Sequence, residues 1–109
     1  MKTKPHNRKL FIAGVEWTIR FQREPVLVDE KTVYGYTDPD KLIVAVGLKS
    51  VVEVQVKRTL IHELLHAIID TIGIHHNEDE EVCVTSLETG IYSVINDPRN
   101  AWLWEFLQG

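Results

Sequence analysis

The chain changes its hydrophobic period once, near residue 47, and this change restricts the fold to strands followed by helices. Residues 15–22 alternate apolar and polar side chains of β-branched and aromatic type, which predicts a half-buried strand. Two more strands are predicted at residues 32–37 and 41–46. The Asp-Pro-Asp turn at residues 38–40 lies between them, so they should pair as an antiparallel hairpin.

Helical patterns follow. Ser50 and Glu53 have the spacing of a capping box, and they predict a helix that ends at Gly73, a glycine suited to the C′ position. The Asn-Glu-Asp-Glu sequence at residues 77–80 predicts a second helix, which should end near residues 96–98. A short final helix is expected to cover the core through four residues: Trp102, Trp104, Phe106 and Leu107.

Length and pattern together predict one domain of α+β class over residues 1–109. Its expected architecture is a short antiparallel three-stranded sheet packed on the long first helix and on the second, glutamate-bearing helix. A hydrophobic fraction of 44% and a charged fraction of 26% are typical of a globular protein.

Charge and apolar runs argue against several partners. A formal net charge of -4 predicts neither nucleic-acid binding nor attraction to an anionic membrane. The first ten residues are locally basic, and we expect a solvated tail there. No apolar run approaches a membrane span and the N-terminus lacks a secretory signal, so a cytoplasmic location is expected. Cys83 is the only cysteine. A single cysteine cannot form an internal disulfide, and Cys83 is expected to be a small core residue.

Residues 62–66 read His-Glu-Leu-Leu-His, which is the H-E-x-x-H pattern of zinc peptidases. Residues four apart on a helix share a face, so His62 and His66 could bind one ion while Glu63 acts on a bound water. A chance match in a chain of this composition has a probability of roughly 2%. Apolar residues nearly encircle the surrounding segment, residues 59–72, which predicts a buried helix.

Catalytic zinc usually takes three protein ligands, so a third ligand is expected elsewhere in the chain. Asp70 shares a face with His66, but a straight helix brings three such residues together poorly, and it is better placed as a second-shell or solvent-facing carboxylate. The apolar stripe predicted to face the core in the second helix consists of Val84, Leu87, Ile91 and Ile95. Glu81 extends this stripe, and Glu88 lies near it. Glu81 is therefore the preferred ligand and Glu88 the alternative. The remaining candidates are His75 and His76, just past the first helix, and Glu78, Asp79 and Glu80, which are explained as cap and dipole residues of the second helix.

From about residue 33 to residue 98 the chain resembles the gluzincin group of zinc peptidases, in particular the small ImmA/IrrE-like and phage-encoded forms. The resemblance rests on the motif helix and on the Glu81 to Thr85 segment, with further similarity at residues 90–92 and 96–98. In that group a glutamate in the first turns of the second helix is the third ligand, and a polar residue four positions later supports a motif histidine. Glu81 and Thr85 match these positions, although Thr85 departs from the usual Asp or Asn.

The resemblance implies a minimal zincin in which Glu63 serves as general base and acid for peptide-bond hydrolysis at a zinc held by His62, His66 and Glu81. A peptide or protein substrate would add as a strand beside residues 42–46, although an ordinary hairpin arm explains that segment equally well. The oxyanion donor is left open among Tyr34, Tyr36, Tyr92, His75 and His76.

Two other hypotheses remain. A metal-stabilised scaffold or regulatory binding protein, or an enzyme that needs an activating protein partner, would suit so short a chain, which offers half a cleft. Retention of Glu63 argues against a purely structural site, because structural zinc favours four closed ligands. A zinc-free helical module with a buried His-Glu network would fold regardless of a chelator.

Overall fold

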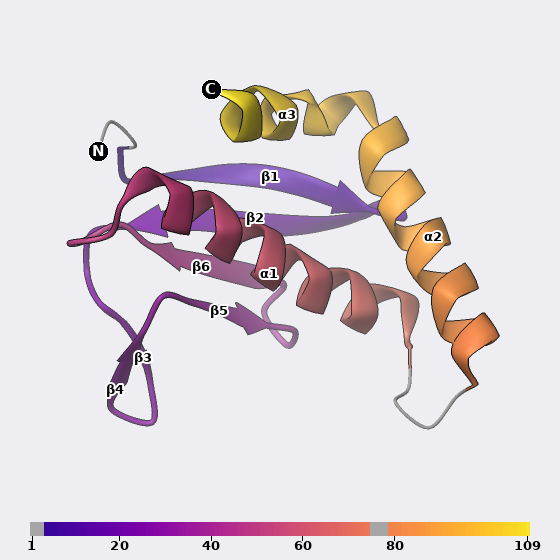
Figure 1. Cartoon of the computed structure of the whole chain (residues 1–109), viewed down its shortest axis with the longest axis horizontal. Coiled ribbons are helices and arrows are strands. Elements are labelled where there is room, and N and C mark those ends of the chain that lie inside the picture. The colour runs from indigo at the N-terminus through magenta and orange to yellow at the C-terminus, as the bar shows by residue number, and fades with distance from the viewer. Residues whose placement is uncertain (1–3, 75–78) are drawn as a thin grey trace.

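The computed structural model describes residues 4–74 and 79–109. Over these residues a run of strands precedes the helices, as the change of period predicts, and the α+β class is confirmed (Figure 1). The elements in chain order are β1 (His6–Ile12), β2 (Val15–Gln22), β3 (Val26–Val28), β4 (Lys31–Val33), β5 (Gly35–Asp38), β6 (Ile43–Gly47), α1 (Glu53–Ile72), α2 (Glu80–Asn96), the 3-10 turn η1 (Pro98–Asn100) and α3 (Ala101–Gln108).

The sheet is mixed and larger than expected. Its four strands lie in the order β1-β2-β6-β5, and β3 and β4 form a separate two-stranded ribbon. The predicted hairpin is confirmed, because β5 pairs antiparallel with β6. The expected all-antiparallel, three-stranded sheet is wrong, since β2 pairs with β6 in parallel. The intervening ribbon and β5 return the chain to the end of the sheet where β2 began.

The basic N-terminal segment is largely a strand rather than a solvated tail. β1 pairs antiparallel with β2, with Leu10 opposite Trp17. Leu10 and Ile12 are buried, while Lys9, which precedes them, contacts Thr18 and Glu16 on the other face of the sheet. Strand alternation thus places Lys9 on the open face, while Arg8, on the same face as Leu10, lies over the Trp102 ring of the final helix.

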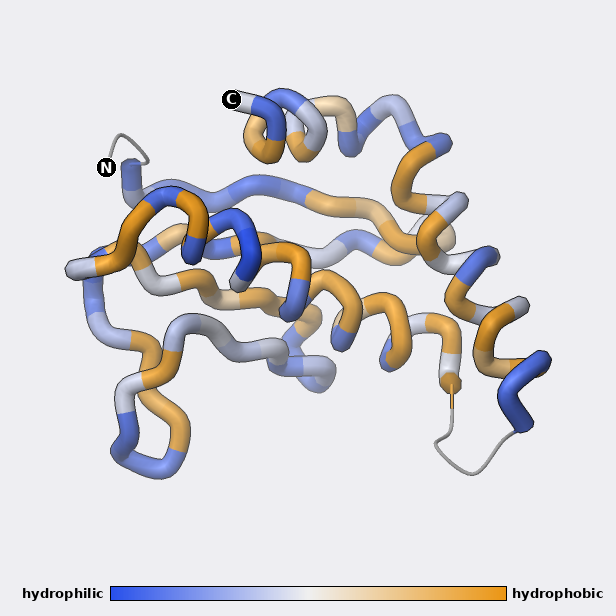
Figure 2. The backbone as a smooth tube through the Cα atoms, viewed as in Figure 1, coloured by the Kyte–Doolittle hydropathy of each residue, from blue (hydrophilic) through white to orange (hydrophobic). Residues whose placement is uncertain are grey.

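The core lies between one face of this sheet and α1, which crosses it (Figure 1). Buried residues alternate with more exposed ones along β2 and β6. Hydrophobic residues predominate along α1, interrupted by short hydrophilic stretches (Figure 2). The indole of Trp17 donates to Thr71 Oγ1 at 2.8 Å and ties β2 to the last turn of α1. The largest buried apolar side chains are Trp17, Phe21, Leu10, Ile12, Ile19, Leu60, Ile68 and Leu103.

The end of α1 was predicted correctly and its start was not. Gly73 has φ 79° and donates its N–H to the Ile69 carbonyl, which is a left-handed C-cap. The N-cap residue is Val52, which makes no side-chain cap bond, and Ser50 lies outside the helix at φ 58°. The expected capping box is therefore absent. Within the described residues, no helix is both long enough and apolar enough to cross a membrane.

The second helix begins and ends as predicted but presents a different face to the core. Asp79 caps α2 by accepting from the Val82 N–H at 2.9 Å, and α2 ends at Asn96. Of the stripe expected to be buried, Val84, Ile91 and Ile95 are exposed, and only Leu87 packs against the core. The face turned inward instead contains Cys83, Leu87, Gly90 and Val94.

A close approach of α1 explains which face of α2 is buried. A Cβ added at Gly90 would lie 2.4 Å from Ile68 Cγ2 and 3.1 Å from Ile72 Cγ1, so only glycine permits this helix contact. The contact surface was therefore marked by a small residue rather than by the most hydrophobic stripe. Cys83 is half-buried on the inward face, close to its expected role.

The short final helix is confirmed. The indole of Trp102 donates to the Lys9 carbonyl at 2.7 Å, and the Phe106 ring lies 5.0 Å from that of Phe21. α3 thereby covers the end of the core beside β1 (Figure 1).

Candidate functional site

The H-E-x-x-H motif lies in the middle of α1, with both histidines on the exposed side. The His62 and His66 rings are 4.9 Å apart between centroids and inclined at 72°. The His62 side chain is 68% exposed. The spacing of four residues thus brings two imidazoles together at the surface of one rigid helix, as predicted.

The expectation that the motif helix is buried all round is wrong. Ile61, Leu65 and Ile69 are 44%, 40% and 37% exposed. A four-stranded sheet covers only one side of α1, so apolar residues remain on the other side. Because the two histidines are exposed, they do not need a buried partner, and only their geometry favours a bound metal.

Glu63 is different from its neighbours because it is buried at 8% exposure. The hydroxyl of Thr37 in β5 lies 2.8 Å from Glu63 Oε1. The other oxygen, Oε2, lies 3.9 Å from Nε2 of His62. The carboxylate thus lies between the edge of the sheet and the histidine pair, with one oxygen bonded and the other turned to the histidines.

Two shallow hollows flank Glu63. The first, of about 320 Å³, contains His62 together with Tyr34, Gly35, Gln55, Arg58, Thr59 and Glu63. The second, of about 310 Å³, contains His66 together with Tyr36, Thr37, Pro39, Glu63, Ile69 and Asp70. Glu63 lines both hollows, so a molecule entering either of them would meet its carboxylate.

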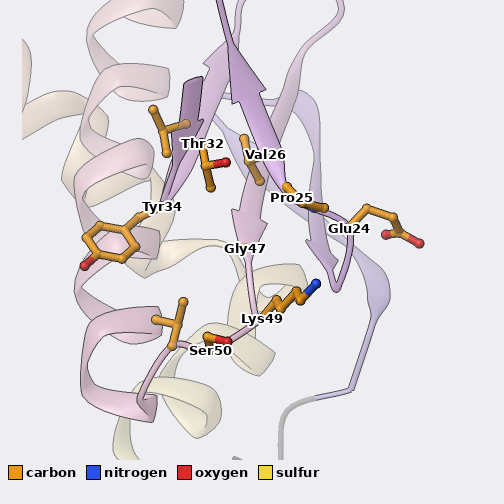
Figure 3. Close-up of a pocket in the computed structure, with 10 residues that line it drawn as sticks. Glu24, Pro25, Val26, Thr32, Tyr34, Gly47, Lys49 and Ser50 are labelled. Carbon is orange, nitrogen blue, oxygen red and sulfur yellow. The ribbon is translucent and has the colours of Figure 1, made fainter. Parts of the chain in front are cut away.

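A larger hollow of about 620 Å³ lies farther along, between the β3–β4 ribbon and the segment that leads into α1 (Figure 3). Val26, Thr32 and Gly47 are among its lining residues, and Lys49 lies at its opening (Figure 3). Tyr34 belongs to this hollow and also to the one that contains His62. The two hollows are therefore neighbours along one side of the molecule.

The structure does not bring the preferred third ligand to the histidines. Glu81 and Glu88 are both exposed on α2, and Glu81 does not lie on the buried stripe that led to its choice. Thr85 is exposed as well. In the part of the chain that is described, no group of three or more His, Cys, Asp or Glu side chains is arranged to hold a metal ion.

The other candidates are distributed as follows. Asp70 is exposed and lines the hollow that contains His66, as expected for a solvent-facing carboxylate. Asp79 caps α2, and Glu80 is exposed in its first turn, which agrees with the capping and dipole roles assigned to them. His75, His76 and Glu78 lie outside the described residues.

The donor set fits zinc in part. Two imidazoles on one helix face are typical zinc ligands, and an adjacent carboxylate with a free oxygen suits a bound water. The described residues supply only these two ligands at the site, so a third has to come from another residue. The arrangement can position a metal-bound water beside Glu63 once that ligand is present.

The proposed peptide cradle needs correction. Residues 42–46 fall mainly in β6, which is an interior strand paired on both sides, to β2 and to β5. Its backbone groups cannot accept another strand. The strand at the edge of the sheet nearest the motif is β5, so any added strand would have to pair there.

Three of the candidate oxyanion donors can be placed. Tyr34 and Tyr36 are exposed beside the motif, Tyr34 in the hollow with His62 and Tyr36 in the hollow with His66. Tyr92 is 64% exposed on α2 and lines neither hollow. The two tyrosines near β5 are thus the ones that could reach a molecule bound at the motif.

Sequence reasoning missed Thr37 and Gly35. A Cβ at Gly35 would lie 2.6 Å from Thr59 Cγ2 and 3.1 Å from Glu63 Cγ, so glycine lets β5 approach α1. Glycine within a strand is a known signal of such close approach and could have pointed to this contact. Thr37 carried no comparable signal, because threonine is common in strands.

Comparison of the chain with known protein families, with curated proteins and with solved structures finds no match.

Proposed function

We propose that this protein is a zinc-dependent peptidase of gluzincin type, built on a minimal zincin fold. The observation that supports it best is a buried glutamate, Glu63, whose free oxygen lies 3.9 Å from His62 Nε2 beside two exposed histidines on one helix face. This combination suits hydrolysis, since buried carboxylates at a surface hollow are costly and are often retained for chemistry.

In this proposal His62 and His66 hold the ion. Glu81, which the structure leaves away from the histidines, would approach as the third ligand when metal binds, with Glu88 as the alternative. A bound zinc would lower the pKa of its water and polarise the scissile carbonyl. Glu63 takes the proton from the attacking water at Oε2 and delivers it to the leaving amine. Tyr34 or Tyr36 would donate to the developing oxyanion.

The substrate is proposed to be an extended peptide that pairs with the free edge of β5. β-strand addition uses backbone groups for affinity and neighbouring hollows for side-chain selection. Tyr34 connects the hollow with His62 to the larger hollow in Figure 3, so a peptide extending in that direction would place a side chain there.

A second candidate is a partner-dependent or purely regulatory metal protein. Ile61 and Leu65, both exposed beside the histidines, favour it, because a protein partner that covered them would also complete the cleft. This candidate predicts metal binding with no hydrolysis by the isolated chain.

The deciding experiment measures zinc per chain by elemental mass spectrometry, with cleavage of casein and of a peptide library as the second readout. The variants are Glu81→Ala, Glu88→Ala and Glu63→Gln. We expect one zinc per chain, lost on Glu81→Ala and kept on Glu88→Ala. Glu63→Gln should keep the zinc and lose about 10²- to 10⁴-fold in rate.

Each alternative outcome has a distinct meaning. Zinc that is retained on Glu81→Ala and lost on Glu88→Ala would assign the third ligand to Glu88. Stoichiometric zinc without cleavage would favour the regulatory candidate. A native protein without bound metal that fails to take up added zinc would overturn the peptidase proposal.

A further inference from the structure

The contact between Thr37 and Glu63 joins the edge strand to the proposed catalytic carboxylate. Thr37 Oγ1 lies 2.8 Å from Glu63 Oε1 and 3.1 Å from the backbone carbonyl oxygen of the same residue. A hydroxyl has a single proton, so it can donate to only one of these oxygens at a time. The ionised carboxylate is the stronger acceptor and the nearer one, and we assign the proton to it.

The close approach of β5 to α1 makes this contact possible. Gly35 and Thr37 lie two residues apart on β5, so they face the same side of the strand, which is the side toward α1. Gly35 has no Cβ to collide with Thr59 and Glu63, which lets the strand lie close to the helix. At this separation the short threonine side chain reaches the carboxylate directly.

The contact also orients the carboxylate. With Oε1 accepting from Thr37, the second oxygen of Glu63 is the one on the side of His62, at 3.9 Å from Nε2. A carboxylate that lacked this anchor could rotate about its terminal torsion, for which the energy wells are broad. The oxygen that acts as the base would then occupy several orientations.

We propose that Thr37 is a positioning residue for Glu63, which holds Oε1 so that Oε2 faces His62, where a metal-bound water would lie. This inference rests on the proposed peptidase function for its catalytic meaning. The orientation of Glu63 can be measured in the absence of any activity.

A different role for Thr37 would be to satisfy a buried carboxylate and nothing more. Any group that stabilised the fold would then serve, and catalysis would change only as far as folding did. The two roles differ in what happens to kcat when the protein is fully folded. They also differ in whether a hydroxyl on a smaller side chain restores the effect.

The structural arm of the test compares crystal structures of the full chain carrying Thr37→Val or Thr37→Ser with that of the wild type, all without added metal. Valine has the shape of threonine without the hydroxyl, and serine keeps the hydroxyl. We expect the Glu63 carboxylate to rotate or to occupy several orientations in Thr37→Val and to keep its native orientation in Thr37→Ser. A native orientation in Thr37→Val would overturn the proposal.

The kinetic arm measures kcat and KM separately on a peptide cleaved by the wild type, at equal zinc content. We expect Thr37→Val to lower kcat by about 10- to 100-fold with little change in KM, and Thr37→Ser to restore most of the rate. Thr18→Val is the matched control, since Thr18 lies in β2 and accepts from Lys9 on the open face of the sheet. It should leave kcat unchanged.

Failure of this inference differs from failure of the peptidase proposal. A kcat for Thr37→Val within about twofold of the wild type, or an equal loss in Thr18→Val, would overturn the positioning role while hydrolysis stands. A wild type that cleaves nothing would overturn the peptidase proposal instead. The crystal structures would still decide whether Thr37 orients Glu63.

Discussion

Asn100 shows how much of this small fold can depend on one buried amide. Its side chain is completely buried. It accepts from the Phe11 N–H at 2.8 Å and donates to the carbonyls of Phe11 at 2.7 Å and Val94 at 3.0 Å. The amide thus supplies to β1 the bonding pattern of another strand and joins β1 to the end of α2.

Replacing this amide should be costly. We expect Asn100→Leu to lower the free energy of unfolding by about 3 kcal/mol, because both backbone groups of Phe11 lose their buried partner. Urea denaturation measures the change. Asn96→Leu, at an exposed position on α2, is the control and should change stability by no more than about 0.5 kcal/mol. Equal losses in the two variants would show that the amide contributes nothing specific.

Residue-scale chemistry also explains what the sequence could reveal about the site. The motif predicted two imidazoles on one face because helix periodicity fixes that relation within a few residues. The contact between Thr37 and Glu63 depends on how a strand 26 residues earlier docks against the helix. No local pattern encodes such docking, so this part of the site became visible only in three dimensions.

At the scale of elements, the contact between α1 and α2 depends on Gly90. We expect Gly90→Ala to destabilise the protein by about 1–3 kcal/mol, because the added methyl would lie 2.4 Å from Ile68 Cγ2 and force the helices apart. Helix propensity alone would make alanine more stable than glycine at this position by about 1 kcal/mol. The expected destabilisation is therefore the net effect, in which the clash outweighs the gain in propensity.

Thermal unfolding of Gly90→Ala beside Thr89→Ala provides the check. Thr89 is exposed on the same helix, and its replacement should be neutral or slightly stabilising. A gain in Tm for Gly90→Ala would mean that the helices do not approach as described.

The corner between α2 and α3 makes stability depend on pH. Asp97 accepts from both the side chain and the backbone N–H of Arg99. The hydrogen bonds from the Arg99 side chain, followed by that from its backbone, hold the pKa of the Asp97 carboxyl below its ordinary value of 3.8. A lowered folded-state pKa means that this contact stabilises the fold above the unfolded-state pKa and is lost as the pH falls through the folded-state pKa.

We therefore expect Asp97→Asn to have a lower Tm than the wild type near about pH 6, with the difference narrowing below about pH 4. Scanning calorimetry across this range measures it. Asp40→Asn, in the exposed turn between β5 and β6, is the control for removing a surface carboxylate. A constant difference between Asp97→Asn and wild type at every pH would contradict the assignment.

Element boundaries were predictable where local chemistry determines them and not where packing does. The C-cap at Gly73 and the start of the second helix within residues 77–80 follow from residue type, and both are confirmed. The inward face of α2 was predicted wrongly, because hydrophobicity favoured Ile91 and Ile95 whereas the helix contact requires a small residue. β1 was missed because Arg8 and Lys9 obscured the alternation of its buried residues: Lys9 lies on the open face, but Arg8 lies on the inner face over Trp102.

At the scale of the whole molecule, the core and the proposed metal site are separate. The buried cluster lies between the sheet and the inner side of α1, while His62 and His66 are on its outer side. A chelator should therefore leave the far-UV circular dichroism unchanged. It should lower the free energy of unfolding, and with it Tm, only by the loss of binding energy, which is about 2.7 kcal/mol if zinc was present at 100 times its Kd. Collapse of the helical signal on chelation would show that folding requires the ion.

The free edge of β5 has a consequence for the behaviour of the protein in concentrated solution. Backbone groups that can receive a peptide can also receive the same strand of a neighbouring molecule, which is how edge-to-edge aggregation starts. β5 is only four residues long, and it is followed by Pro39, which has no N–H to donate. The free edge is thus so short that pairing between two copies would contribute little free energy of association. A peptide ligand with further contacts in the adjacent hollows would bind more favourably.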